Sequence, residues 1–442
     1  MRQTSSHSGR SPDCRNNEPT SLAVNASLDY ATRESNAMST RRVAVTGLGV
    51  ICALGNNTSE TWNAVREGRS GIAPIHSVDI SKLRFRNGAQ VCGYDPSKHF
   101  ETNHAHLLDP FCQFAIIAAR EALRDSRITL TPELCEKVAI VTGSGMGGQI
   151  TQDAGFAKVY QRDRARVDPL TIPRAMANAG ASHISMEFGI TGPTYTISTA
   201  CCSANHAIGQ AFWMVRNGIV DVAIAGGSEA PFSFGFLKAW EALRVMSPDT
   251  CRPFSKDRRG LILGEGGAML ILEPLAAARA RGAMIHAEVV GFGMSSDTHH
   301  LTHLSIDGPV RAMRAALRDA RLLPEQVGYI NAHGSGTLIN DPLETRAIRE
   351  VFGAHADRLA VSSTKSLHGH ALGATGAMEA VCTVLGLKNG LLPPTANFTV
   401  PDPDCNLDVV PNRARPAQVE FALSNSFAFG GLNAVLAFRG PK

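Results

Sequence analysis

The sequence predicts an α/β fold with largely buried sheets. Short runs of apolar and β-branched residues end repeatedly in glycine-rich turns, and segments with helical periodicity lie between them. The chain has 442 residues, of which 44% are apolar and 19% are charged, so it can bury a large core. Because buried strands that alternate with helices form sheets covered on both faces, these observations favour a layered α/β architecture.

The strands can be followed along the chain. The first one begins at Arg42 in "RRVAVTGLGVICALG". The same texture returns in "KVAIVTGSGMGG" (137–148), "VDVAIAGGSEA" (220–230), "QVGYINAHGSGT" (326–337), "RLAVSSTKSLHGHALG" (358–373) and "FALSNSFAFGG" (421–431). Each run therefore predicts a buried strand followed by a turn.

Helices are predicted between these strands. Apolar residues recur at three- and four-residue spacing in "DPFCQFAIIAAREALRDS", "GPVRAMRAALRDARL" and "GAMEAVCTVLGLKNG". The strand "GAMIHAEVVGFGMSSD" (282–297) repeats the character of the first strand. We therefore expect two similar halves, residues 41–281 and 282–442.

Composition excludes several classes of protein. The net charge of +4 and the absence of a Lys/Arg block argue against nucleic-acid binding. No apolar run reaches the roughly 18 residues of a membrane span, so no integral membrane segment is expected. Residues 1–40 are polar and aperiodic and lack the apolar core of a secretory signal, so they are predicted to be a disordered extension.

The cysteines indicate a reducing compartment. Ten cysteines are scattered through the chain without CxxC pairs, and no Cys/His group has the spacing of zinc ligands. We therefore expect mostly buried thiols, no metal site and a cytoplasmic location. A peripheral association with the inner membrane stays open, although no segment requires it.

A cysteine pair lies at the first candidate site. In "TISTACCSANHAIGQAFW", residues 195–199 are predicted to be a strand, and a helical apolar face begins at Cys201 and Cys202. Unpaired N–H groups at a helix N-terminus favour an anion, which would lower a thiol pKa. The alternative is that both thiols pack as small apolar groups.

Two histidines follow other predicted strands. His333 lies in "NAHGSGT", while Lys365 and His370 lie in "STKSLHGHALGATGA". In open α/β sheets, functional groups gather where strands end, and histidine can exchange hydrogen bonds with a reacting carbonyl near neutral pH. A structural role for each histidine is the alternative, and His368 is expected to be a loop residue. "SNSFAFGGLN" (424–433) could bring a backbone N–H close to a ligand or could be a plain turn.

Together these segments resemble the condensing enzymes of the thiolase superfamily, specifically the β-ketoacyl-acyl-carrier-protein synthases. The resemblance runs in order from Arg42 to Phe438. Its motifs are "STAC-x-SA", "NAHG-x-GT-x-x-ND-x-x-E", "SSTKS-x-x-GH-x-x-GA-x-GA-x-E" and "SNSF-x-FGG-x-N". It implies a five-layer αβαβα thiolase-like fold of two similar halves, the first with the nucleophile and the second with two histidines.

The resemblance assigns a role to each motif residue. It implies that Cys201 is the nucleophile, that His333 and His370 complete the catalytic centre, and that Cys202 is a packing residue. It implies oxyanion donors in the backbone N–H groups of Cys201 and Phe429. Residues implied to support the centre are Lys365, Glu344, Glu379 and the gating Phe429. Residues implied to contact substrate are Met146, Trp240, Ser335, Thr337 and Phe427.

The chain departs from the family pattern at several positions. Ala428 stands where a glycine is common, Leu432 replaces a usual threonine, and Arg259 stands where many members have Asp. Met146 and Trp240 fall where the family lines its acyl pocket, so the accepted acyl chain is expected to be unusual. "LKAWEALRVMSPDTCRPFS" and "PDPDCNLDVVPN" resemble the nodulation protein E branch of the family, which makes a special acyl chain.

The activity implied is a decarboxylative condensation that extends a Cys201-bound acyl chain by two carbons. The implied partner is an acyl carrier protein, whose phosphopantetheine carries the substrates, and no metal or redox cofactor is required. A homodimer is also implied. Two alternatives remain: a non-catalytic subunit like a chain-length factor, which would lack the cysteine, and a thiolase, which would use a second late cysteine that "SNSFAFGG" lacks.

Overall fold

The computed structural model describes residues 40–161, 166–302 and 305–441. The predicted N-terminal extension lies outside these residues, apart from Thr40. No helix within the described ranges is long and apolar enough to cross a membrane.

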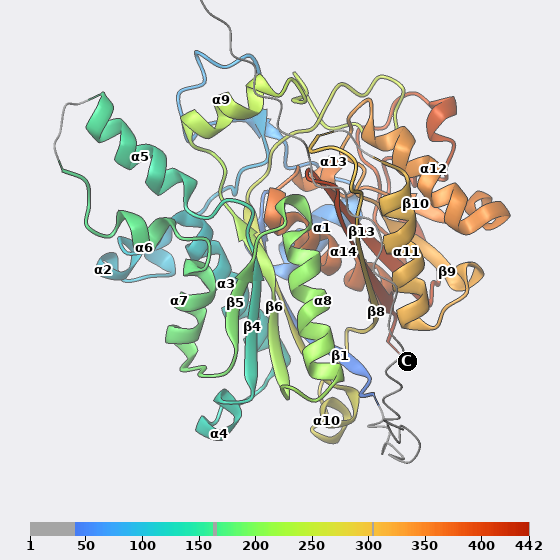
Figure 1. The fold of residues 1–442 in the computed structure, drawn as a ribbon, viewed down its shortest axis with the longest axis horizontal. Coiled ribbons are helices and arrows are strands. Elements are labelled where there is room, and N and C mark those ends of the chain that lie inside the picture. The colour runs from blue at the N-terminus through green and yellow to red at the C-terminus, as the bar shows by residue number, and fades with distance from the viewer. Residues whose placement is uncertain (1–39, 162–165, 303–304, 442) are drawn as a thin grey trace, which may run out of the picture. The chain divides into compact units, whose positions relative to one another are not determined.

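One sheet of ten hydrogen-bonded strands forms the centre of the fold (Figure 1). Its order is β10 (Ala360–Ser362), β9 (Val327–Asn331), β13 (Phe421–Ala428), β14 (Leu432–Arg439), β8 (Ala287–Ser296), β1 (Val43–Cys52), β7 (Gly266–Pro274), β6 (Val222–Glu229), β4 (Val138–Gly143) and β5 (Thr194–Ile197). The predicted strands are therefore all present, although the strand expected at 195–199 is β5 and ends at Ile197.

The sheet consists of two five-stranded halves with the same topology. Numbered within each half, the strands follow the order 3-2-4-5-1, as β5-β4-β6-β7-β1 and as β10-β9-β13-β14-β8. In both halves the first two contacts are parallel and the last two are antiparallel. The halves meet where β1 and β8 pair over only three residues each, Val43–Val45 and Ala287–Val289.

Helices cover both faces of each half, which gives the five layers of the thiolase-like fold. On one outer face, α3 (Pro110–Ser126) packs on β1, β6 and β7, and α7 (Ala179–Phe188) packs on β4 and β5. The central helices α8 (Ser203–Arg216) and α14 (Thr375–Asn389) contact each other and strands of both halves. On the other outer face, α11 (Asp307–Ala320) packs on β8 and β14 and carries α12 (Asn340–Phe352).

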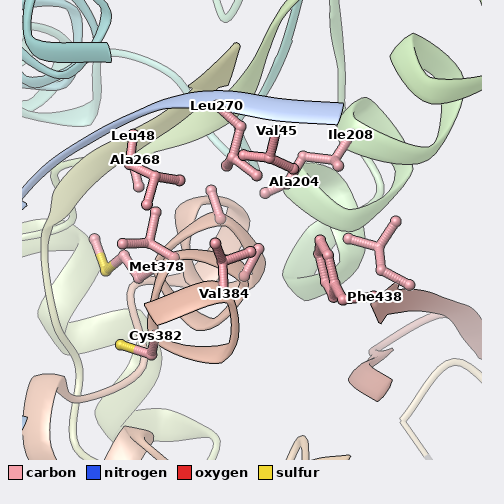
Figure 2. Packing of buried hydrophobic residues seen from close by; sticks show 14 of the residues in the cluster. Val45, Leu48, Ala204, Ile208, Ala268, Leu270, Met378, Cys382, Val384 and Phe438 are labelled. Atoms are coloured by element: carbon pink, nitrogen blue, oxygen red, sulfur yellow. The ribbon is translucent and has the colours of Figure 1, made fainter. Parts of the chain in front are cut away.

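The central helices bury their apolar faces in the main core cluster (Figure 2). Ala204 and Ile208 come from α8, while Met378, Cys382 and Val384 come from α14. The apolar face expected after Cys201 is buried throughout, and α8 ends at Arg216. This packing fixes the N-terminal ends of α8 and α14, which carry residues of the site.

The remaining elements are short or peripheral. They are α1 (Thr58–Glu67), β2 (Ala73–Pro74), β3 (Asn87–Gly88), α2 (Thr102–Ala105), α4 (Pro132–Cys135), α5 (Gln149–Tyr160), α6 (Thr171–Ala175), α9 (Phe234–Ala242), α10 (Leu275–Ala280), α13 (Lys365–His368), β11 (Leu391–Leu392) and β12 (Arg415–Pro416).

Candidate active site

Cys201 lies on a sharp turn between β5 and α8. A single 3-10 turn, Ala200–Cys202, precedes the first residue of α8, so the cysteine lies just before the helix rather than in it. Ala200 has a φ of 51°, a left-handed conformation that costs a non-glycine residue energy. The hydroxyl of Ser203 braces the turn by donating to the carbonyl of Ala200 at 2.7 Å. This strained turn directs the Cys201 side chain into the site.

The thiol of Cys201 meets an imidazole and two backbone N–H groups. Its Sγ lies 3.1 Å from Nε2 of His370. The backbone N–H groups of Phe429 and Cys201 lie close enough to the sulfur to favour its thiolate form. Burial raises the pKa of the thiol to about 11, because desolvation outweighs Lys365 and these N–H groups. The sequence-based expectation of a lowered pKa is therefore wrong.

The hydrogen bonds of His370 determine which ring nitrogen faces the thiol. The backbone N–H of Leu372 donates to Nδ1 at 3.2 Å, and the Thr375 hydroxyl lies 2.8 Å from the same nitrogen. Because Nδ1 accepts a hydrogen bond, we assign the ring proton to Nε2, which faces Cys201. Burial, followed by the charge of Lys365, lowers the His370 pKa well below its usual value, so the ring is neutral at pH 7.

His333 lies beside His370, with ring centroids 5.5 Å apart. The carboxylate of Glu344, on α12, accepts the backbone N–H of His333 at 2.8 Å and that of Gly334 at 2.7 Å, which fixes the loop after β9. Among the described residues, Nδ1 of His333 is buried without a hydrogen-bond partner. Burial and Lys365 lower the His333 pKa well below its usual value. The site thus holds two neutral imidazoles.

Lys365 and Glu379 form a fully buried ion pair behind the histidines. Nζ of Lys365, on α13, lies 2.5 Å from Oε1 of Glu379, on α14, and neither side chain is exposed. Burial raises the Glu379 pKa to about 7, while the Lys365 charge opposes that shift. The lysine does not line either cavity at Cys201. It therefore acts on the site through its charge.

Two cavities reach Cys201. The histidine-side cavity, ≈ 280 Å³, is lined by His333, His370, Ser335, Thr337 and Phe427, together with Arg244 and Arg259. The apolar cavity, ≈ 500 Å³, is lined by Met146, Phe236, Ala239, Leu243 and Leu372. Cys201, Trp240 and Phe429 line both. Every residue that the resemblance implies to contact substrate therefore lines a cavity at the thiol.

The histidine-side cavity has a polar part. The hydroxyls of Ser335 and Thr337 lie 3.0 Å apart. Arg244 and Arg259 are exposed, and neither has an ion-pair partner among the described residues. This cavity therefore combines two hydroxyl groups and two guanidinium groups with the imidazoles of His333 and His370.

Two neighbouring residues have structural surroundings. The Sγ of Cys202 is buried and lies 2.9 Å from the carbonyl of Ser426 and 3.0 Å from that of Leu432, away from both cavities. His368 is not the loop residue that the sequence predicted. It ends α13 and is buried, with Nε2 2.9 Å from the Thr364 hydroxyl.

Sequence reasoning missed Glu229, at the end of β6. Its buried carboxylate accepts the N–H groups of Gly145 at 2.6 Å, Met146 at 3.2 Å and Gly373 at 3.0 Å. It thereby joins the loop after β4 to the segment that follows His370. Burial raises its pKa to about 7. The signal was available, because Glu229 ends a buried strand in "VAIAGGSE", but its partners are distant in sequence.

Comparisons with known sequences agree on one family across most of the chain. The family model described as "Beta-ketoacyl synthase, N-terminal domain" matches residues 40–278, and "Beta-ketoacyl synthase, C-terminal domain" matches residues 286–399. Nodulation protein E of a Rhizobium species is 46% identical over 399 residues, which are 90% of this chain and 99% of that protein. The 3-oxoacyl-[acyl-carrier-protein] synthase 2 of a Synechocystis species is 41% identical over 407 residues, 90% of this chain and 98% of that protein.

A solved structure shares the fold. The ishigamide ketosynthase/chain length factor superposes with a TM-score of 0.87 at 36% sequence identity, covering 91% of this chain and 100% of that chain.

Proposed function

The chain belongs to the β-ketoacyl synthase family of condensing enzymes, and we propose that it extends an acyl chain bound to Cys201 by two carbons. The 3.1 Å contact between Cys201 Sγ and His370 Nε2 is the observation that carries this proposal. Cys201 is the acyl acceptor, and His333 and His370 act on the extender unit.

The first half-reaction is a thiol–thioester exchange. The Cys201 sulfur attacks the carbonyl carbon of an acyl thioester, and the sulfur that carried the acyl chain leaves as a thiolate. Cys201 loses one proton and the departing thiolate takes one up. The N–H groups of Cys201 and Phe429 lie beside the sulfur, where they can donate to the oxyanion that develops on the attacked thioester carbonyl. Because the thiol pKa is raised, the Nε2–H of His370 and the Lys365 charge have to stabilise the thiolate as it forms.

The second half-reaction is a decarboxylative condensation. A malonyl thioester enters the histidine-side cavity, where the two imidazoles hydrogen bond to its carbonyl oxygen. Loss of CO2 leaves an enolate, whose carbon attacks the Cys201 thioester and releases the cysteine as a thiolate, which takes up a proton. The neutral imidazoles can stabilise an enolate by hydrogen bonding without first losing a proton. The thiol, the imidazoles and the backbone donors supply every group that this chemistry requires.

The substrates arrive on the phosphopantetheine arm of an acyl carrier protein. Ser335 and Thr337 offer hydroxyl groups to the amides of such an arm, and Arg244 and Arg259 offer positive charge to its phosphate. The Arg259 guanidinium, where many members of the family carry Asp, strengthens that electrostatic attraction.

The enzyme assembles as a homodimer. The apolar face that we assign to the interface contains Phe156, Tyr160, Ile172, Met176, Met186 and Tyr195, all of them exposed. They lie on or beside α5, α6, α7 and β5, and β5 is the end strand of the sheet. A large exposed apolar patch beside an unpaired strand edge favours association with a second copy.

The resident acyl chain is a specialised one. Trp240 and Met146 give the apolar cavity a bulky and an adaptable wall. The identity with nodulation protein E is higher than that with the 3-oxoacyl synthase. We therefore place the product in specialised acyl-chain synthesis, such as that of a nodulation signal, rather than in bulk fatty-acid synthesis.

Covalent labelling tests the nucleophile. Wild type, Cys201→Ala and Cys202→Ala are each incubated with carrier-protein thioesters of different chain length and unsaturation, and the label is located by intact and peptide mass spectrometry. We expect the label on Cys201 in wild type and in Cys202→Ala, and none in Cys201→Ala. Cys202→Ala is the matched control because it removes a thiol that lines neither cavity.

The same experiment can contradict the proposal. Normal labelling of Cys201→Ala, or no labelling of wild type by any thioester, would remove Cys201 as the acceptor. The second outcome would favour a non-catalytic subunit that shapes the product of a partner synthase. The preferred chain in the panel identifies the acyl class.

A further inference from the structure

Two stacked rings separate the cavities at Cys201. The ring centroids of Trp240 and Phe429 are 6.2 Å apart, with an interplanar angle of 26°. Both rings, like Cys201, line the histidine-side cavity and the apolar cavity. A chain attached to Sγ therefore lies against this stack when it enters the apolar cavity.

The two rings are held very differently. Trp240 is only 8% exposed and packs in an apolar cluster with Leu237, Leu263 and Leu372. Phe429 lies in the turn between β13 and β14, where it is half-buried. Trp240 is therefore the fixed ring, and Phe429 is the ring that can move.

The turn that carries Phe429 has open space beside Gly430. Gly430 and Gly431 follow it with φ of 87° and 69°, and a Cβ added at Gly430 would meet no atom within 4 Å. The N–H of Gly430 donates to the carbonyl of Leu301 at 2.7 Å. A Cβ added at Gly431 would lie 2.7 Å from Cβ of Asp297, so the freedom to move lies at Phe429 and Gly430 rather than in the whole turn.

The position of Phe429 also sets the position of a hydrogen-bond donor. Its backbone N–H is one of the two that reach the Cys201 sulfur. Any displacement of the turn that removes the ring from the path also displaces this N–H. A contact that holds the ring therefore holds the donor.

We propose that Trp240 is a latch that holds Phe429 over the entrance of the apolar cavity, so that long chains, but not short ones, must break the Trp240–Phe429 stack to enter. Trp240 is on this account a positioning residue that sets chain-length discrimination. The proposal rests on Cys201 being the acyl acceptor proposed above. The strength of the latch is that of one aromatic pair.

Alkylation kinetics test the latch without any enzymatic turnover. The rate of Cys201 alkylation is measured with iodoacetamide and with N-decyl iodoacetamide in a Cys92→Ser background. This background removes the one cysteine that is exposed within the part of the chain that the structure describes. We expect Trp240→Leu to raise the decyl-to-unsubstituted rate ratio by about two- to tenfold, and Trp240→Phe to stay near wild type. Phe236→Leu is the matched control, because Phe236 lines the apolar cavity but not the histidine-side cavity. An equal ratio in Trp240→Leu and Phe236→Leu would overturn the latch.

A double-mutant cycle separates a latch from a wall. If Trp240 acts by holding Phe429, then Trp240→Leu should have little further effect on the rate ratio in a Phe429→Leu background. Additive effects of the two substitutions on the logarithm of the ratio would show that Trp240 only shapes the cavity, and they would overturn the proposal.

Fluorescence supplies a readout that needs no change at Trp240. The chain has three tryptophans, so Trp62→Phe with Trp213→Phe leaves Trp240 as the single emitter. We expect complete alkylation of Cys201 by the decyl reagent to shift the Trp240 emission and alkylation by iodoacetamide to leave it nearly unchanged. Equal emission after both would contradict the latch. If the alkylation results hold while no acyl thioester labels Cys201, the proposed function fails and the latch as a conformational device stands.

Discussion

The thiols of Cys201 and Cys202 are neighbours in the chain with opposite surroundings. The first meets His370 and two backbone N–H groups at the junction of two cavities. The second meets two backbone carbonyls, and burial raises its pKa well above the ordinary value. Hydrogen-bond donors stabilise a thiolate and carbonyl acceptors do not, so these surroundings support the proposal that Cys201 is the nucleophile.

At the same scale, Lys365 should control the acid limb of the pH profile. Its charge contributes to the lowered pKa of both His333 and His370, so both rings stay neutral well below pH 6.5. Removing that charge in Lys365→Met with Glu379→Gln raises both pKa values toward the ordinary one. The rings then become protonated at higher pH. We expect the acid limb of malonyl-thioester decarboxylation to move to higher pH, measured by CO2 release.

The control for this prediction is Glu379→Gln alone. It keeps the Lys365 cation and removes a buried carboxylate, so its acid limb should not move to higher pH. Identical limbs in the double variant and wild type would show that burial alone keeps the histidines neutral.

At the scale of elements, the packing of α8 against β8 holds the two halves together and fixes the start of α8. Gly209, on α8, makes this close approach possible. A Cβ added there would lie 2.4 Å from the ring of Phe292, which is fully buried on β8 and also packs edge-on against Trp213. The glycine is therefore required by the neighbouring ring, although alanine is the better helix former.

Gly209→Ala should destabilise the protein by about 1–3 kcal/mol, because the added methyl group overpacks the contact between α8 and β8. The readout is the thermal unfolding midpoint at a fixed scan rate. Gly155→Ala, on α5, is the matched control, since its Cβ would meet only Thr171 at 3.4 Å. That substitution should be neutral or stabilising by up to about 1 kcal/mol. Equal midpoints for the two variants would show that this contact adapts to the extra methyl group.

At the scale of the whole molecule, the repeated 3-2-4-5-1 topology explains how one chain builds one site. The first half supplies the turn with Cys201, and the second half supplies the loops with His333 and His370 and the turn with Phe429. The central helices α8 and α14 hold the contributions of the two halves together. The ten-stranded sheet ends at β5, beside the apolar face defined above.

The oligomeric state tests the role of that face. We expect wild type to sediment as a dimer in analytical ultracentrifugation, and Ile172→Glu with Met186→Glu to sediment as a monomer, because two charges would be buried without partners. Ile219→Glu is the control, since Ile219 is an exposed isoleucine outside this face. A dimer that withstands the double substitution would place the interface elsewhere.

The sequence by itself determined the order of strands and helices, the α/β class and the family, and its motifs gave the proposal that Cys201, His333 and His370 form the catalytic centre. It could do so because hydrophobic periodicity and strand-end motifs are local in the chain. For "SNSFAFGG" the sequence left two alternatives, a plain turn or a segment that brings an N–H close to a ligand. The segment is a turn between two strands, and the N–H of its Phe429 also lies beside the Cys201 sulfur.

Only the tertiary structure decided the pKa direction of Cys201, the burial of His368, the linking role of Glu229 and the stacking of Trp240 on Phe429. Each of these depends on groups far apart in the chain: Glu229 accepts N–H groups from around residues 145 and 373, and Trp240 meets a ring 189 positions later. Desolvation is likewise a property of everything packed around a group. A motif can name the reacting atom, but the surrounding fold sets its charge state and its access.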